Sequence, residues 1–262
     1  MNFIEALILG IIQGLTEFLP VSSSGHIELG AVLLNVQSKD NLLFSIIVHG
    51  ATALSTIVVF RKTIIQIIVE LLEFKWNEST QFITKIIISM IPVGIAGVFF
   101  EKQIESFFGG NVIFVASMLL VTGLLLTFTY FTNSQKKDVN YWKALIIGLA
   151  QAIAILPGIS RSGATISTAI LLGVDKEKAT KFSFLMVLPP ILGAMLLKIK
   201  DLIEQPELIN NISFPVLSVG FIAAFISGVI ACSWMVNIVK RGKLIYFAIY
   251  CIIVGLSVII FS

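Results

Sequence analysis

The sequence predicts an all-α integral membrane protein with two inverted-topology repeats, each formed by a re-entrant helical hairpin and three transmembrane helices. Three observations predict this fold: an apolar composition, an internal repeat, and an uneven distribution of lysine and arginine. Hydrophobic residues make up 57% of the 262 residues and charged residues 13%, whereas a soluble domain carries about 25% charged residues. The net charge of +3 is spread over loops and does not indicate a nucleic-acid partner.

Apolar runs that approach the roughly 20 residues needed to cross a bilayer follow the hairpin in each repeat. The first repeat, 1–138, has its hairpin at about 3–36 and spans at about 42–60, 83–100 and 112–131. The second repeat, 139–262, has its hairpin at about 141–174 and spans at about 182–198, 215–239 and 244–261. No cleavable signal pattern opens the chain, so we expect the first apolar segment to be retained.

The two halves share residues at an offset of 138 positions. Residues 2–13 align with 140–151, with Asn, Ala, Leu, Ile, Gly and Gln matching. The offset persists in a polar stretch, where the first half has Ser22, Ser24 and Gly25 and the second has Ser160, Ser162 and Gly163. Matching polar residues and glycines at one offset are not expected by chance between apolar sequences. We interpret them as an internal repeat, which membrane proteins use in parallel or inverted form.

The segment after His26 distinguishes these two forms. From His26 to about Val36 a helix rises roughly 16 Å, about half of a hydrocarbon core of about 30 Å, so this segment cannot span. If each hairpin enters and leaves on one side, thirteen basic residues lie on one side and four on the other, namely Lys39, Lys102, Lys198 and Lys200. If each hairpin crosses, the split is nine to eight. The positive-inside rule favours the hairpins, with the basic side cytoplasmic and both termini outside.

Each hairpin contains a helix-breaking proline. Pro20 and Pro157 remove a backbone donor and restrict the preceding residue, and Gly25, Gly158 and Gly163 permit tight turns. Non-helical backbone at membrane depth occurs only where it is buried in protein or lines a wet cavity. We therefore expect the hairpins to meet near the midplane and to build one site from both repeats.

Glu17 is a carboxylate within an apolar segment, one turn before the first break. Such a group costs about 3 kcal/mol unless it is paired, hydrated or bound to a cation, so we expect a functional role, with a structural tether as the alternative. Gln13 lies one turn earlier on the same face, and the two are the candidate ligands of a divalent cation, Mg²⁺ or Ca²⁺. By contrast, His49, Cys232 and Cys251 have no polar company, and we expect them to be structural.

Ser22, Ser23, Ser24 and Gly25 stand directly before the helix that begins near His26. Free N–H groups and the helix dipole at such a start favour an anion, although a single serine there is as often a helix cap. His26 can transfer protons near neutral pH or attack phosphorus itself. The cluster as a whole therefore predicts an anion-binding and catalytic segment.

Arg161 is the only arginine inside an apolar segment, at the start of another helix. Its fork of donors suits bidentate binding of phosphate. The residues expected to bind the same phosphate are Ser160, Ser162, Gly163 and Thr165. A purely structural ion pair between Arg161 and Glu17 is the alternative.

Two motifs resemble the signatures of a known family. Gln13-x-x-x-Glu17 followed by Phe-Leu-Pro-Val-Ser-Ser-Ser-Gly-His at 18–26, and Pro-Gly-Ile-Ser-Arg-Ser-Gly-Ala-Thr at 157–165, are similar to those of the bacterial undecaprenyl-diphosphate phosphatases, the bacitracin-resistance family. The resemblance covers essentially the whole chain. The family position matched by Gln13 is Glu or Gln, so this chain carries the less acidic option.

The resemblance implies hydrolysis of undecaprenyl diphosphate to undecaprenyl phosphate and inorganic phosphate at the bacterial cell membrane, assisted by a divalent cation. Ser23 is expected to attack the terminal phosphorus while Glu17 and His26 handle protons or the ion, and Arg161 and its neighbours clamp the diphosphate. His26 is the alternative nucleophile. Inverted repeats with broken helices are also the architecture of secondary transporters, so a transporter or flippase of an anionic prenyl-phosphate lipid stays open, as does a homodimer.

Overall fold

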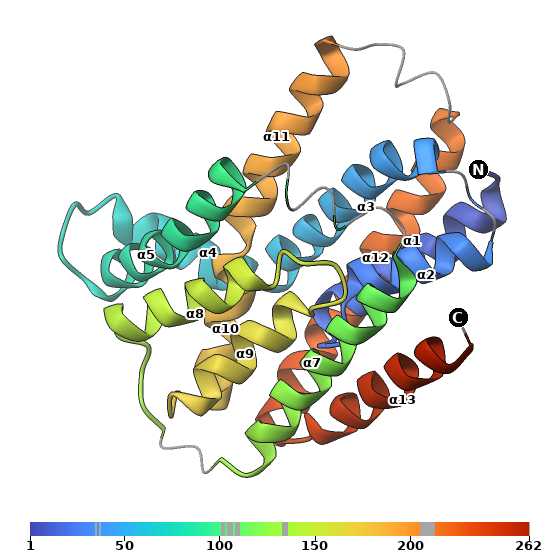
Figure 1. Ribbon diagram of the computed structural model, residues 1–262. Coiled ribbons are helices and arrows are strands. Elements are labelled where there is room, and N and C mark those ends of the chain that lie inside the picture. Colours follow the sequence, from blue (N-terminus) through green and yellow to red (C-terminus); the bar gives the residue numbers. More distant parts are fainter. Residues whose placement is uncertain are drawn as a thin grey trace.

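The computed structural model describes residues 1–34, 36, 38–100, 103, 107, 111–132, 136–204 and 213–261. Over these residues the chain forms helices and no strand, which confirms the predicted all-α class (Figure 1). The first half contains α1 (Phe3–Phe18), α2 (Ser23–Leu33), α3 (Ser38–Val59), α4 (Arg61–Leu71), α5 (Glu78–Phe99) and α7 (Val112–Tyr130). The second half contains α8 (Tyr141–Ile153), α9 (Arg161–Leu171), α10 (Lys176–Met186), α11 (Leu188–Glu204), α12 (Phe214–Lys240) and α13 (Ile245–Phe261). Lys102, used above to predict the orientation, lies outside the described residues.

Several helices are long and apolar enough to cross a membrane. Within the described ranges these are α5, α7, α12 and the stretch Lys176–Leu197 that α10 and α11 share. A fifth span would join Leu43–Val59 to α4, but these two helices are bent by 75° at their junction, a bend that the sequence did not reveal. α13, with 17 residues, is a shorter apolar helix. The protein is therefore a multi-pass membrane protein.

Each predicted hairpin is interrupted at its proline. α1 ends shortly before Pro20 and α2 begins at Ser23, while the connection between α8 and α9 contains Pro157 and ends at Arg161. The second helix of each pair has 11 residues, about 16 Å of rise. Neither α2 nor α9 is long enough to cross a bilayer.

Helices of one half pack against helices of the other. α1 packs along α12, α8 along α5, and α7 along α13. In Figure 1, α1 begins beside the N label and α8 begins at the opposite edge, so that both run towards the centre from opposite sides. Glycine permits the close approach, because a Cβ at Gly14 would overlap the carbonyl oxygen of Ala224 and one at Gly148 that of Ser89.

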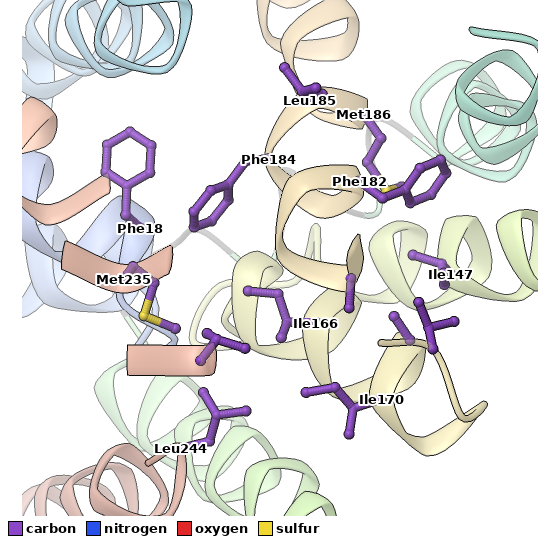
Figure 2. Packing of buried hydrophobic residues seen from close by; sticks show 14 of the residues in the cluster. Phe18, Ile147, Ile166, Ile170, Phe182, Phe184, Leu185, Met186, Met235 and Leu244 are labelled. Atoms are coloured by element: carbon purple, nitrogen blue, oxygen red, sulfur yellow. The ribbon is translucent and has the colours of Figure 1, made fainter. Parts of the chain in front are cut away.

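The largest hydrophobic cluster also joins both halves (Figure 2). Phe18 of α1 meets Phe184 of α10 edge to face, with ring centroids 5.5 Å apart and an interplanar angle of 86°. Met235 of α12 and Ile166 of α9 belong to the same cluster. Because Phe18 directly follows Glu17, this packing holds the end of α1, and with it the carboxylate, against the second half.

Candidate active site

Glu17 is the centre of a polar cluster that draws on both halves. Its Oε1 accepts a hydrogen bond from Arg161 Nη2 within an ion pair. Its Oε2 accepts hydrogen bonds from Gln13 Nε2 at 3.0 Å and from Ser23 Oγ at 2.6 Å. The Glu17 side chain is 5% exposed and that of Arg161 27%, so each charge depends on the other for compensation. The structure thus brings together Glu17, Gln13, Ser23 and Arg161.

The start of α2 is capped by Ser22. Ser22 Oγ accepts the Gly25 N–H at 3.3 Å and lies 3.3 Å from Ser24 Oγ. Ser22 has a φ of 70°, a left-handed backbone conformation that is strained for a residue other than glycine. Such strain persists only where the surroundings enforce it, and it is common at functional sites. Ser22 is therefore a helix cap held in a strained backbone conformation.

The start of α9 repeats this arrangement. Ser160 Oγ accepts the Gly163 N–H at 3.0 Å and lies 3.3 Å from Ser162 Oγ. Thr165 Oγ1 donates to the carbonyl of Arg161 at 2.9 Å. In both halves the glycine N–H expected to bind substrate therefore already donates to a cap, whereas hydroxyl groups remain beside the helix start.

The two interrupted segments contact each other directly. Ser162 Oγ donates to the carbonyl oxygen of Leu19 at 3.3 Å. A Cβ built on Gly25 would lie 3.5 Å from the Cα of Gly158. Gly158 has a φ of +94°, and a Cβ there would overlap the carbonyl oxygen of Val115. Gly158 is thus required by its backbone conformation and by its contact with α7, close to where the two interrupted segments meet.

Both ring nitrogens of His26 bond to groups outside the Glu17 cluster. Its Nδ1 lies 2.8 Å from the carbonyl oxygen of Ser22, and its Nε2 lies 2.8 Å from Tyr250 Oη of α13. Because a carbonyl can only accept, Nδ1 carries the proton and Nε2 accepts from the Tyr250 hydroxyl. These bonds do not join His26 to Ser23 or Glu17, the residues with which the sequence grouped it.

His49 of α3 lies beside Glu17, a proximity that the sequence analysis missed. His49 Nε2 is 3.9 Å from Glu17 Oε2, and Nδ1 is 2.8 Å from the carbonyl oxygen of Ser45. No local motif marks His49, since its neighbour comes from another helix. The one available signal was a polar side chain in the span that follows the hairpin.

A narrow pocket opens beside Glu17 and Arg161. Its remaining polar lining consists of hydroxyl side chains from three helices, Thr52, Thr56, Ser162, Thr165 and Ser183. Aromatic and aliphatic side chains, among them Phe18 and Phe184, complete the wall. The pocket is small, with a volume of about 10 Å³, roughly the space of one water molecule, and its guanidinium and hydroxyls are groups that bind oxyanions.

Comparison with known proteins identifies the family. Residues 6–257 match the family described as bacitracin resistance protein BacA. The chain belongs to the BacA family. Relatives named undecaprenyl-diphosphatase include that of Christiangramia forsetii, 56% identical over 100% of this chain and 99% of the relative. That of Bacteroides thetaiotaomicron is 52% identical, covering 99% of each chain, and that of Methanobrevibacter smithii is 38% identical, covering 98% of this chain and 97% of the relative.

In this BacA-family chain, Gln13 and Glu17 present oxygen atoms suited to a divalent cation. Gln13 Oε1 is buried without a hydrogen-bond partner among the described residues. The Glu17 carboxylate can accept about four hydrogen bonds and accepts three here, so about one acceptor position is free for another ligand. The described part of the chain holds no group of three or more His, Cys, Asp or Glu side chains that suits a metal. Gln13 turns its Nε2 towards Glu17, so a Mg²⁺ or Ca²⁺ ion held by these two residues would take few ligands from the protein and would keep most of its water or phosphate ligands.

Proposed function

We propose that this BacA-family protein hydrolyses undecaprenyl diphosphate to undecaprenyl phosphate and inorganic phosphate. This activity recycles the lipid carrier of peptidoglycan synthesis and confers bacitracin resistance. It is the activity stated in the names of the relatives. The observation that carries the proposal is the 2.6 Å hydrogen bond from Ser23 Oγ to Glu17, the carboxylate that is ion-paired with Arg161. A nucleophile, a base and a cation thereby share one site.

Ser23 is the nucleophile in this proposal. Glu17 Oε2 takes the hydroxyl proton as Ser23 Oγ forms a bond to the terminal phosphorus. The bond from that phosphorus to the bridging oxygen breaks, and undecaprenyl phosphate leaves. Water then attacks the phosphoserine, inorganic phosphate departs, and Ser23 regains a proton. The hydrogen bond already present between Ser23 and Glu17 supports this order of events.

His26 has a proton-handling role in the proposal. Its Nε2 is engaged by Tyr250, so an attack on phosphorus would first require that bond to break. Ser23, which already donates to Glu17, needs no such rearrangement. We therefore prefer Ser23 over His26 as the nucleophile.

Arg161 binds the terminal phosphate. One of its five N–H donors contacts Glu17, and the rest of the fork can bind phosphate oxygens. Transfer of a phosphoryl group depends mainly on positioning and charge stabilisation, which a guanidinium beside two helix starts supplies. The residues that we propose to surround the bound phosphate are Ser22, Ser24, Gly25, Ser160, Ser162, Gly163 and Thr165. Of these, the Gly25 and Gly163 N–H groups and the Ser162 and Thr165 hydroxyls donate to the protein itself, so they would have to exchange partners to donate to phosphate.

A divalent cation at Gln13 and Glu17 is part of the proposal. Mg²⁺ or Ca²⁺ there supplies positive charge that offsets the charge of the diphosphate. The buried and unpartnered Gln13 Oε1 supports this assignment.

The repeats 1–138 and 139–262 are proposed to be inverted in the bacterial plasma membrane, with both termini outside. The exchange of partners supports a twofold relation between the repeats, because α1 packs on α12 and its equivalent α8 packs on α5. The inverted orientation rests on the distribution of lysine and arginine. Substrate then keeps its prenyl chain in the bilayer while its head reaches the midplane. The homodimer stays a prediction, which light scattering of the detergent-solubilised protein tests.

Phosphate release from purified protein and undecaprenyl diphosphate tests the function. We expect Ser23→Ala to release no phosphate above background, and Ser233→Ala, at an exposed helical serine that bonds its own helix, to match the parent. Equal rates for Ser23→Ala and the parent would overturn the mechanism. A parent that releases no phosphate but moves lipid diphosphate across vesicle membranes would be a carrier instead.

A further inference from the structure

The hydroxyl groups of the active-site pocket differ in what they bind. Thr52 Oγ1 donates to the carbonyl of His49 at 2.9 Å, and Thr56 Oγ1 to that of Thr52 at 3.2 Å. Thr165 and Ser162 likewise donate to backbone carbonyls, at 2.9 Å and 3.3 Å. Each of these four hydroxyls has therefore given its only proton to the protein.

Ser183 of α10 is the exception in this pocket. Its side chain lines the pocket together with Glu17 and Arg161. The residue is 3% exposed, and its Oγ has no hydrogen-bond partner among the described residues. A helical serine usually satisfies its hydroxyl on the carbonyl one turn earlier, and a buried hydroxyl without a partner is destabilising.

The internal repeat explains how this hydroxyl lost its partner. Ser183 corresponds to Ser45 at the offset of 138, and Ser45 Oγ lies 3.3 Å from His49 Nδ1. At the position equivalent to His49 the second half has Val187, which offers no polar atom. Val187 itself lines the pocket, as do Ser183 and Arg161.

We propose that Ser183 is a substrate-binding residue whose hydroxyl donates to a phosphate oxygen of the diphosphate held by Arg161. The proposal rests on the proposed function, which supplies the diphosphate. An oxyanion suits both groups, since Arg161 has donors beyond the one bonded to Glu17 and the Ser183 hydroxyl has a proton to donate. Substrate binding then satisfies the buried hydroxyl that the free protein leaves unpaired.

Ser167 of α9 provides a matched control. It is fully buried and its Oγ also lacks a hydrogen-bond partner among the described residues, but it does not line the pocket. Replacing either serine by alanine removes an unsatisfied hydroxyl, and neither change should lower the Tm. Only the change at Ser183 should alter substrate binding.

Two measurements on the purified full-length protein test this inference. In steady-state phosphate release from undecaprenyl diphosphate, we expect Ser183→Ala to raise KM roughly tenfold, the loss of one hydrogen bond to a charged group, with kcat changed less than about twofold. In thermal unfolding, a methylenediphosphonate analogue of the prenyl diphosphate should raise the Tm of the parent and of Ser167→Ala by more than that of Ser183→Ala.

The outcomes separate this inference from the proposed function. An unchanged KM and an unchanged Tm shift for Ser183→Ala would overturn the role of Ser183 while hydrolysis stands. A parent that binds the analogue through Ser183 but releases no phosphate would overturn hydrolysis while the binding role stands. A parent that neither binds nor cleaves would overturn both.

Discussion

His26 and Tyr250 face each other across the two halves, with Nε2 and Oη 2.8 Å apart and the rings stacked at a centroid distance of 5.6 Å. The chain has two histidines, and His49, like His26, holds its Nδ1 against the carbonyl four residues earlier. In each ring Nε2 is therefore the nitrogen left for another partner. For His26 that partner is Tyr250, which orients the imidazole at the edge of the active site.

Replacing Tyr250 by phenylalanine should lower kcat about fivefold, because the ring stack survives while His26 loses one hydrogen bond worth about 1 kcal/mol. Tyr246→Phe, on the same helix and exposed, is the matched control and should match the parent. With ¹⁵N-labelled histidine, one of two ring systems should change its Nε2 signal in Tyr250→Phe. A full rate with an unchanged spectrum would show that the contact does not matter.

Replacing Glu17 by glutamine should reduce phosphate release by at least about 100-fold, because the side chain keeps its shape but no longer takes the proton of Ser23. Arg161 loses its countercharge, so the Tm should fall as well. Glu5→Gln is the control, since a glutamine retains the capping box that Glu5 forms with Asn2. Substantial activity in Glu17→Gln would exclude Glu17 as the base.

Gly158→Ala should destabilise the protein by more than about 1 kcal/mol, because φ is +94° and the new Cβ meets the carbonyl oxygen of Val115. Gly193→Ala, where a Cβ meets no atom within 4 Å, should be neutral or stabilising. The Tm and the yield of monodisperse protein in detergent measure both effects. A Gly158→Ala protein as stable as the parent would contradict the tight contact between Gly158 and α7.

A chelator should abolish phosphate release, and Mg²⁺ or Ca²⁺ should restore it. Gln13→Met removes the buried ligand oxygen at similar volume, so we expect a several-fold higher cation concentration for half-maximal activity. Gln151→Met is the control, because Gln151 holds the equivalent position in the second half and is also buried. If Gln13→Met and the parent need the same concentration, the cation binds elsewhere.

Much of the fold could be predicted because it follows from local chemistry. The apolar runs predict the helices, and Pro20 and Pro157 predict the interruptions, since each acts on its own backbone. Glu17 and Arg161 could be paired in advance because a charge at membrane depth requires an opposite charge or a ligand.

Other features depend on contacts between distant segments. His49 and Tyr250 approach the site because α3 and α13 pack near it. The spacing of residues along the sequence does not reveal such contacts between distant helices. His26 was grouped with Ser23 by proximity in the chain, but the Ser22 carbonyl one turn earlier captures its Nδ1. The unpaired hydroxyl of Ser183 likewise becomes visible only once its neighbours are known.

Ser23 and Arg161 begin α2 and α9 and correspond at the offset of 138. One backbone position thus presents the hydroxyl that we propose as the nucleophile in one half and the guanidinium in the other. At the same offset Glu17 corresponds to Ile155 and His26 to Ala164. The two repeats are therefore similar in fold, but the carboxylate and the imidazole come from the first repeat alone. If Ser23 and Arg161 have the roles proposed above, neither half is competent without the other.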